Sequence, residues 1–92
     1  MDNRKRYRIV FSKTFKKEFE KLSGIHKAMV LEKFLIMEQN PFYPSLRTKK
    51  MKGRNKHFES SVNMDIRILW RFRDSKIIAA LDVGHHDILN KY

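Results

Sequence analysis

The residues best suited to chemistry lie in the second half of the sequence. His85 and His86 directly follow Gly84, and imidazole both gives and takes protons near neutral pH. Arg67 and Arg71 stand four positions apart, and their planar guanidinium groups suit the oxygens of a phosphate. Together these residue types favour acid–base chemistry on an anionic substrate. Cysteine is absent, which excludes a metal–thiolate site.

The histidine pair also has a simpler interpretation. Residues 85–87 suit an ordinary polar turn in which Asp87 caps a following helix. A metal site is not expected, because the i,i+4 spacing of helical ligands is missing and the other histidines are His26 and His57.

Arg67 and Arg71 belong to a segment, residues 66–73, that alternates with the period of a β-strand. Ile66, Ile68, Trp70 and Phe72 are predicted to face inward. The residues between them project from the other side of the sheet: Arg67, Leu69, Arg71 and Arg73. The preceding segment alternates in the same way, which brings three polar side chains within cross-strand reach of the arginines: His57, Glu59 and Ser61. The alternative is a solvated surface with weak ion pairs between Glu59 and Arg67 or Arg71.

A run of cations without any acid occupies residues 47–56. Its members are Arg47, Lys49, Lys50, Lys52, Arg54 and Lys56. We interpret the run as an exposed loop that clamps phosphates, with a merely solvated charge run as the alternative. The lysines of residues 13–21 are interpreted as a solvated helix face.

The whole chain is basic. It has 92 residues with 21 Lys and Arg against 10 Asp and Glu, so the formal net charge is 21 − 10 = +11. Such an excess indicates a polyanionic partner: nucleic acid, an acidic protein or a membrane surface. The length predicts a single domain over residues 1–92. No apolar run is long enough to span a membrane or to form a signal-peptide core, so we expect a cytoplasmic protein.

The hydrophobic periodicity predicts the elements that position these residues. A strand is expected over 6–11, then one helix from Ser12 to about Ser23 and a second over 25–39, joined at Gly24. Strands are expected over 57–63, 66–73 and 76–83, with the last in the centre of the sheet and ended by Gly84. The order predicts an α+β fold: an N-terminal strand, a two-helix hairpin, then an antiparallel three-stranded meander. The sheet would have about four strands, with the helices packed on one face.

Several segments resemble toxins of the RelE/ParE superfamily from bacterial type II toxin–antitoxin modules. The resemblance covers nearly the whole chain. It rests on residues 7–12 (Tyr-Arg-Ile-Val-Phe-Ser) with 15–17, on 51–53 (Met-Lys-Gly), on 65–70 (Asp-Ile-Arg-Ile-Leu-Trp) and on 83–87 (Val-Gly-His-His-Asp). The family fold is the arrangement predicted above.

The resemblance implies roles for individual residues. Arg67 is similar to the family's arginine that stabilises the scissile phosphate, and His85 to the histidine that transfers a proton in YafQ-like and YoeB-like toxins. His86 stands where RelE-like members carry an arginine, and Asp65 matches an aspartate of the YafQ type. Tyr92 falls where some members end in a tyrosine.

The second-strand lysines of RelE have no clear counterpart. Glu59 stands there as a candidate general base, similar in role to a glutamate of YoeB-like toxins.

The resemblance therefore implies a toxin that cleaves mRNA, mostly on the ribosome, without a metal or other cofactor. Arg67, His85, His86 and Glu59 would be catalytic. Residues of the basic run, with Arg71 and Tyr92, would bind RNA. Its implied partners are mRNA, the ribosome and a cognate antitoxin, which we expect to be acidic. The alternatives are a gyrase poison of the ParE type and a basic RNA-binding module without catalysis.

Overall fold

The fold is a five-stranded sheet with two helices, seen in a computed structural model that describes residues 6–53 and 56–87. The strands are β1 (Arg8–Phe11), β2 (Lys49–Lys50), β3 (His57–Ser61), β4 (Ile66–Asp74) and β5 (Ile77–His85). The helices are α1 (Lys13–Glu20) and α2 (Gly24–Gln39), and a short 3-10 helix, η1 (Pro44–Leu46), precedes β2. The predicted α+β fold class is confirmed.

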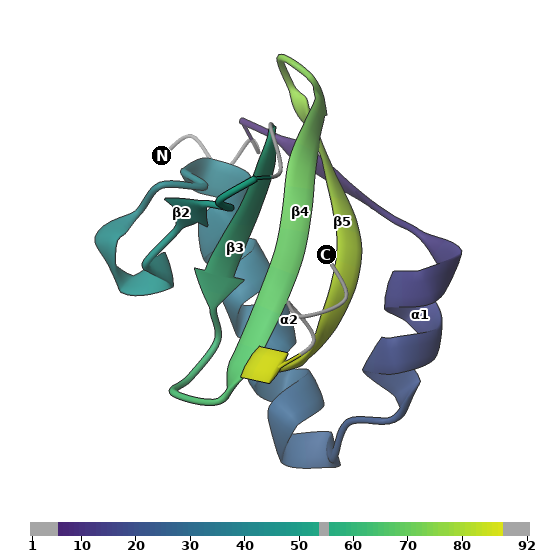
Figure 1. Ribbon diagram of the computed structural model, residues 1–92. Coiled ribbons are helices and arrows are strands. Elements are labelled where there is room, and N and C mark those ends of the chain that lie inside the picture. The colour runs from purple at the N-terminus through teal and green to yellow at the C-terminus, as the bar shows by residue number, and fades with distance from the viewer. Residues whose placement is uncertain (1–5, 54–55, 88–92) are drawn as a thin grey trace, which may run out of the picture.

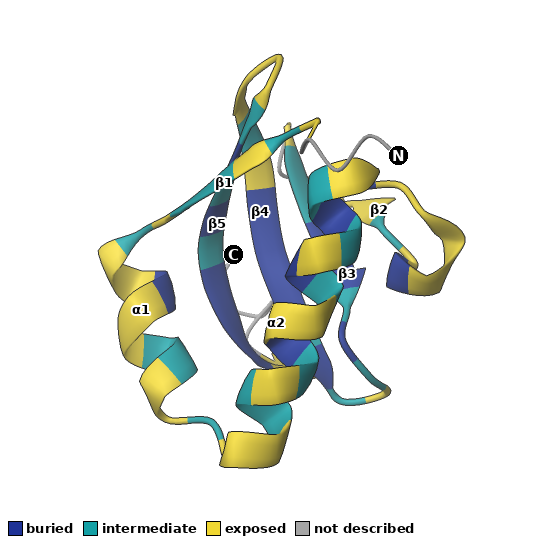
Figure 2. Cartoon of the chain, turned by 180° about the vertical axis from the view of Figure 1, so that it is seen from behind, coloured by how far each residue is buried: buried dark blue, intermediate teal, exposed yellow. Residues whose placement is uncertain are grey.

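The sheet has the strand order β1-β5-β4-β3-β2 (Figure 1). β1 runs parallel to β5, and the other neighbouring strands are antiparallel. β5 therefore lies inside the sheet, as its apolar sequence predicts, while the parallel β1 forms one edge. Both long helices lie on the same face of the sheet (Figure 2).

A serine caps the N-terminus of each long helix. The side chain of Ser12 accepts a hydrogen bond from the backbone N–H of Phe15, and Ser23 does the same for His26. Each bond satisfies an N–H that has no partner within the helix, which fixes where the helix begins. Gly24 is thus the first residue of α2 and does not end α1, contrary to expectation.

The core lies between the helices and the inner face of β4 and β5. Trp70, Ile66 and Ile68 of β4 have no exposed surface, and Val30 and Met37 of α2 pack on the same side. Burial of each such side chain stabilises the fold by roughly 1.5–3 kcal/mol. The inward direction predicted for alternate residues of β4 is confirmed.

Three details differ from the expectation. The basic run is not a loop throughout, because Lys49 and Lys50 pair with β3 and make the fifth strand. β5 continues through Gly84 to His85, so the glycine does not end the strand. Leu69, predicted to point away from the core, is fully buried on the other face, in a row with Glu59 and Asp82.

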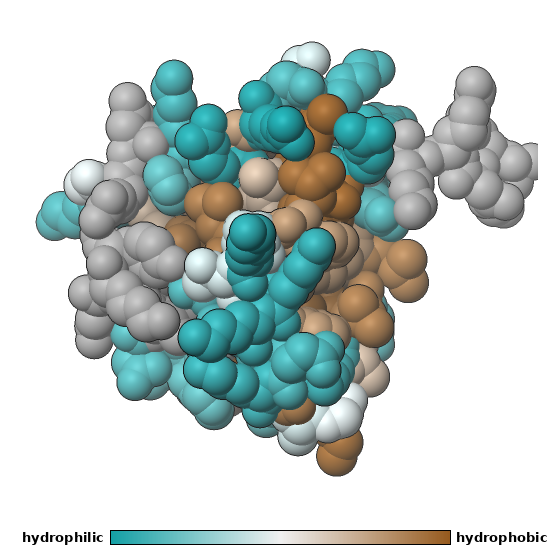
Figure 3. All heavy atoms as spheres, turned by 90° about the vertical axis from the view of Figure 1, so that its right-hand side faces the viewer, coloured by the Kyte–Doolittle hydropathy of each residue, from teal (hydrophilic) through white to brown (hydrophobic). Residues whose placement is uncertain are grey.

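Some apolar surface remains exposed beside the helices. A hollow of about 350 Å³ is lined largely by Phe11, Phe15, Phe19 and Leu31. Seen from the α1 side, apolar side chains gather next to strongly hydrophilic ones (Figure 3).

Neither of the two long helices combines the length and the apolar character needed to cross a lipid bilayer, among the residues described.

A buried chain of hydrogen bonds connects the core to the start of the basic run. The indole N–H of Trp70 donates to Ser60 Oγ at 2.8 Å, and Ser60 Oγ lies 2.6 Å from Thr48 Oγ1. Thr48 Oγ1 in turn donates to the carbonyl of Pro41 at 2.7 Å. Because each hydroxyl has one proton, Ser60 must donate to Thr48, and the chain has a single direction. The residue that follows Arg47 is thereby fixed to the core.

Removal of this chain's central hydroxyl should destabilise the fold. We expect Ser60→Ala to lower the free energy of unfolding by about 1–3 kcal/mol, because the buried Trp70 N–H loses its acceptor. Urea denaturation followed by Trp70 fluorescence measures this. The control is Ser75→Ala in the exposed β4–β5 turn, expected to change stability by less than about 0.5 kcal/mol. Equal stability of the two variants would contradict the assigned role.

Candidate active site

The predicted catalytic residues gather at one end of the sheet, where the β3–β4 hairpin meets the end of β5. In the register of β4 against β5, Ile66 lies opposite His85 and Arg67 lies opposite Gly84. Against β3, Arg67 lies opposite Ser61. Arg67 and His85, 18 positions apart in the sequence, therefore lie on adjacent strands, and His86 directly follows β5. Because His85 is paired with the inward-facing Ile66, its side chain leaves the sheet on the face opposite to that of Arg67.

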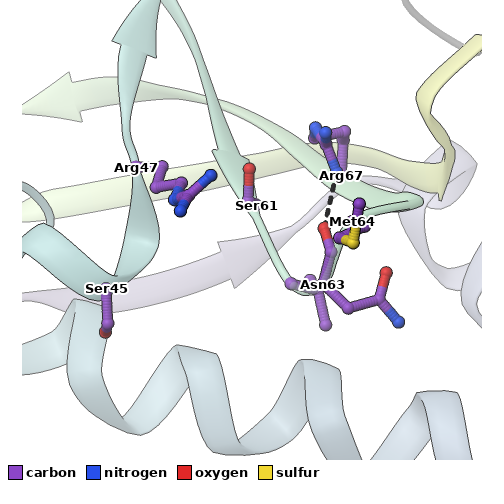
Figure 4. Close-up of a pocket in the computed structure, with 7 residues that line it drawn as sticks. Ser45, Arg47, Ser61, Asn63, Met64 and Arg67 are labelled. Carbon is purple, nitrogen blue, oxygen red and sulfur yellow. Dashed lines mark hydrogen bonds between the residues drawn. The ribbon is translucent and has the colours of Figure 1, made fainter.

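The turn between β3 and β4 holds Arg67 in place. Asn63 Oδ1 accepts hydrogen bonds from the backbone N–H groups of Asp65 and Ile66, at 2.8 and 2.6 Å. Its backbone carbonyl accepts a bond of 2.6 Å from Arg67 Nη1 (Figure 4), which also lies 3.2 Å from the carbonyl of Ile66. A short polar side chain that closes its own turn is a property of Asn. Asn63 thus fixes both the turn and the arginine.

Asp65, in the same turn, contacts both histidines. Its Oδ2 forms a very short hydrogen bond with His85 Nδ1, and its Oδ1 lies 3.5 Å from His86 Nδ1. The hydrogen bond from His85, aided by His86, lowers the pKa of Asp65 below its ordinary value. Since an ionised carboxylate only accepts, His85 Nδ1 must carry the proton, which leaves Nε2 as the acceptor of the neutral ring. The side chains of His85 and His86 are 60% and 71% exposed, so a substrate can reach them.

Glu59 lies one row further along the sheet. Its nearly buried side chain forms an ion pair with Lys49, with Oε1 and Nζ 3.1 Å apart. The alternative interpretation paired Glu59 with Arg67 or Arg71, but β2 brings Lys49 directly opposite Glu59. Glu59 is placed diagonally to Arg67 on the same face of the sheet, and a role as base remains a prediction.

A hollow of about 310 Å³ adjoins Arg67. Its lining comes from the connector before β2, from the end of β3 and from the turn: Ser45, Arg47, Ser61, Val62, Asn63, Met64 and Arg67 (Figure 4). Arg47 has φ of 47° and ψ of 42°, in the left-handed region. That conformation costs a residue other than glycine roughly 1–2 kcal/mol.

The basic run divides between two places. Arg47 lines the hollow beside Arg67, whereas Lys49, Lys50 and Lys52 line a different one of about 330 Å³ together with Met51 and Glu59. Among the other predicted RNA-binding residues, Arg71 is exposed on β4 opposite His57, and Arg54 and Tyr92 lie outside the described residues.

The sequence places Ser61 within reach of the arginines, and its pairing with Arg67 confirms this. Sequence reasoning did not find Ser45 or the role of Asn63. The signal for Asn63 was present, since Asn two positions before Asp in a tight turn favours this side-chain bond. Ser45 carries no signal, because only the path of the connector brings it to the hollow. Within residues 6–53 and 56–87, no group of three His, Cys, Asp or Glu side chains is placed to hold a metal ion.

Comparison by sequence gives no match, since neither a protein-family model nor a curated protein resembles the chain significantly. Comparison by structure gives many. The RelE–RelB complex from Pyrococcus horikoshii matches with a TM-score of 0.73 at 21% identity, over 87% of this chain and 94% of that one. The RelBE2 toxin–antitoxin complex from Mycobacterium tuberculosis matches with 0.72 at 26% identity, over 88% and 99%.

The DinJ–YafQ toxin–antitoxin complex from E. coli has a TM-score of 0.69 at 17% identity, over 91% of this chain and 97% of that one. These matches span almost the full length of both chains. The resemblance seen in the sequence is thereby confirmed at the level of the fold, and this chain has the fold of the RelE superfamily toxins.

Proposed function

We propose that the protein is the toxin of a type II toxin–antitoxin system and a metal-independent endoribonuclease that cleaves mRNA on the ribosome. One observation carries the proposal. Arg67, held by its own turn, and a histidine whose tautomer is set by Asp65 lie at the same end of a toxin-like sheet. These groups suffice for cleavage of RNA, which carries its own nucleophile.

The proposed reaction is a transfer within the RNA strand. A base takes the proton of a 2′-hydroxyl, and that oxygen attacks the adjacent phosphorus. The bond from phosphorus to the 5′-oxygen breaks, and an acid protonates this leaving oxygen. The products are a 2′,3′-cyclic phosphate and a 5′-hydroxyl, so atoms and electrons balance without a metal.

Arg67 would stabilise the charge that develops on the phosphate oxygens. Both hydrogen bonds described for its side chain use Nη1, and they tie the guanidinium to the turn. A donor fixed in advance needs no reorganisation as charge develops, which makes it more effective in the transition state than a mobile one.

The proton transfers fall to His85, His86 and Glu59. Asp65 orients His85 so that Nε2 accepts a proton when the ring is neutral and donates one when it is charged. The most economical assignment uses His85 as one partner and either Glu59 or His86 as the other. The carboxylate of Glu59, paired with Lys49, would serve as base.

The remaining cations would bind RNA and ribosome phosphates. Lys50 on β2, Lys52 just after it and Arg71 on β4 are all exposed, so they are open to a nucleic-acid backbone. Binding through such contacts weakens steeply with salt.

An acidic antitoxin is the proposed protein partner. The net charge of +11 favours a partner of opposite sign. The similar toxins from Pyrococcus horikoshii and Mycobacterium tuberculosis were solved in complexes with their antitoxins. Co-expression of a small acidic protein encoded next to this one should restore growth.

Induced expression with mapping of RNA ends tests the activity. We expect discrete cuts within the codons of translated mRNA, and Arg67→Ala should reduce cleavage by about 10²–10³-fold, because it loses the charge clamp. Arg73→Ala on the same strand, about 20 Å from Arg67 and exposed, is the matched control and should cut normally. DNA damage with intact mRNA would favour gyrase poisoning. An active, folded Arg67→Ala variant would overturn the site.

Separate substitutions distinguish the histidines. We expect His85→Ala to reduce cleavage by about 10²–10⁴-fold and to relieve growth arrest, because it removes the imidazole oriented by Asp65. His86→Ala should have a smaller effect if Glu59 is the other partner. His26→Ala, in the first turn of α2, is the control. If His85→Ala cleaves as fast as His26→Ala, then His85 is not catalytic.

Asp65→Asn tests the orienting contact by its pH dependence. The folded protein holds the pKa of Asp65 below its ordinary 3.8, so its contribution to stability is present above that pH. This contribution is lost as the pH falls through the lower, folded pKa. Wild type should therefore exceed Asp65→Asn in Tm at neutral pH, and the difference should shrink below pH 3.8.

Asp87→Asn is the control, because Asp87 is exposed and directly follows His86. Its difference in Tm from wild type should not shrink in the acid range. A difference between wild type and Asp65→Asn that stays constant across the acid range would show that the carboxylate's charge is not involved.

A further inference from the structure

We propose that the hollow between Arg47 and Arg67 binds one phosphate of single-stranded RNA, next to the phosphate that is cut. The inference rests on the proposed function, which it deepens by assigning Arg47 a defined position on the substrate. Arg47 thereby becomes distinct from the lysines of the same run, which would contact the nucleic acid less specifically.

The lining of the hollow suits an anion. Two guanidinium groups come from segments 20 positions apart, and Figure 4 shows the Arg47 side chain pointing from its connector toward β3, where Ser61 lies. Ser61 adds a hydroxyl donor, and none of the described residues that line the hollow is an acid. Arginine forks with hydroxyls beside them are the usual partners of phosphate oxygens. Val62 and Met64 supply apolar surface for the attached sugar or base.

Hydrogen bonds fix the backbone at Arg47 and at the residue after it. Its own N–H donates to the carbonyl of Pro44 at 3.1 Å, which closes the turn of η1. The next residue, Thr48, is joined through Ser60 to the buried Trp70. The connector is therefore anchored to the core immediately after Arg47, although the arginine itself is exposed.

The backbone of Arg47 gives a second, independent indication. It adopts the left-handed conformation with φ of 47°, at the end of a 3-10 helix where glycine would be without strain. Strained residues of this kind cluster at functional sites. A phosphate contact explains why an arginine stands there.

The neighbouring lysines are directed elsewhere. Lys49 is paired with Glu59 at 3.1 Å, and Lys50 and Lys52 line the other hollow. Arg47 is thus the second cation that lines the hollow beside Arg67, the arginine proposed to contact the scissile phosphate.

Binding of a short 2′-O-methyl RNA tests the inference without cleavage, because that strand has the phosphates and lacks the nucleophile. Fluorescence anisotropy over a range of salt gives the affinity and its salt slope. We expect Arg47→Ala to weaken binding about tenfold, the loss of one charged hydrogen-bonded contact. The slope of log K against log salt should fall by about 0.7, one phosphate on a single strand. Arg73→Ala, with the same loss of charge, should leave affinity and slope unchanged.

Arg47→Gly separates binding from folding. Glycine relieves the left-handed strain, so the Tm should stay equal or rise, while RNA binding should fall as in Arg47→Ala. Unchanged affinity and slope in the folded Arg47→Ala and Arg47→Gly proteins would overturn the inference. A folded glycine variant that binds weakly supports it, since lost structure cannot then explain the loss.

The outcome is distinguishable from failure of the proposed function. If wild type does not cut RNA but the two Arg47 variants lose one phosphate contact, the binding site stands and the nuclease proposal fails. If wild type cuts, Arg47→Ala should raise KM with little change in kcat, whereas Arg67→Ala should lower kcat. A fall in kcat alone for Arg47→Ala would instead place Arg47 at the reacting phosphate and overturn the assignment to its neighbour.

Discussion

The register of β4 between its two neighbours is the constraint on which the site depends. All residues of β4 except Arg73 have a partner on β5, and residues 67–71 also have one on β3. A shift by one position would turn every side chain to the opposite face. Trp70, Ile68 and Ile66 enforce that register, because a slip would move three fully buried apolar side chains out of the core. The same pairing places Arg67 opposite Gly84, the residue before His85. The position of Arg67 at this end of the sheet is thus a consequence of how the core packs.

Polar contacts then fix the β3–β4 turn and the start of the basic run to these strands. Asn63 closes the β3–β4 turn and binds the guanidinium of Arg67. The bonds from Trp70 through Ser60 to Thr48 tie the basic run to the same strand pair. Both connections use buried or half-buried groups, whose bonds are costly to break because no water replaces them. These contacts hold Arg67 and the backbone next to Arg47 at defined positions.

Much of the fold could be predicted from the sequence, because alternation and helical spacing are local signals. The inward residues of β4, the interior place of β5 and both helices follow from them. The strand β2 could not be predicted, because two adjacent lysines carry no strand signal of their own. They become a strand only by pairing with Glu59 and Phe58 of β3. The outward direction of Leu69 follows from the alternation, but its burial does not, because alternation says nothing about whether that face is covered. Gly24 and Gly84 predict breaks by residue type, but Ser23 starts α2 at Gly24 and the pairing with Arg67 continues β5 through Gly84.

For the site, residue types suggested Arg67 and the histidines, and the resemblance added Asp65 and Glu59. Their mutual placement depends on strand pairing between distant segments, which composition does not encode. The most direct test is the chemistry of the RNA ends made by the purified protein on translating ribosomes. We expect fragments that end in a 2′,3′-cyclic or 3′-phosphate and begin with a 5′-hydroxyl. Fragments with a 5′-phosphate and a free 3′-hydroxyl would contradict the proposed reaction, because the 2′-oxygen would then not be the nucleophile.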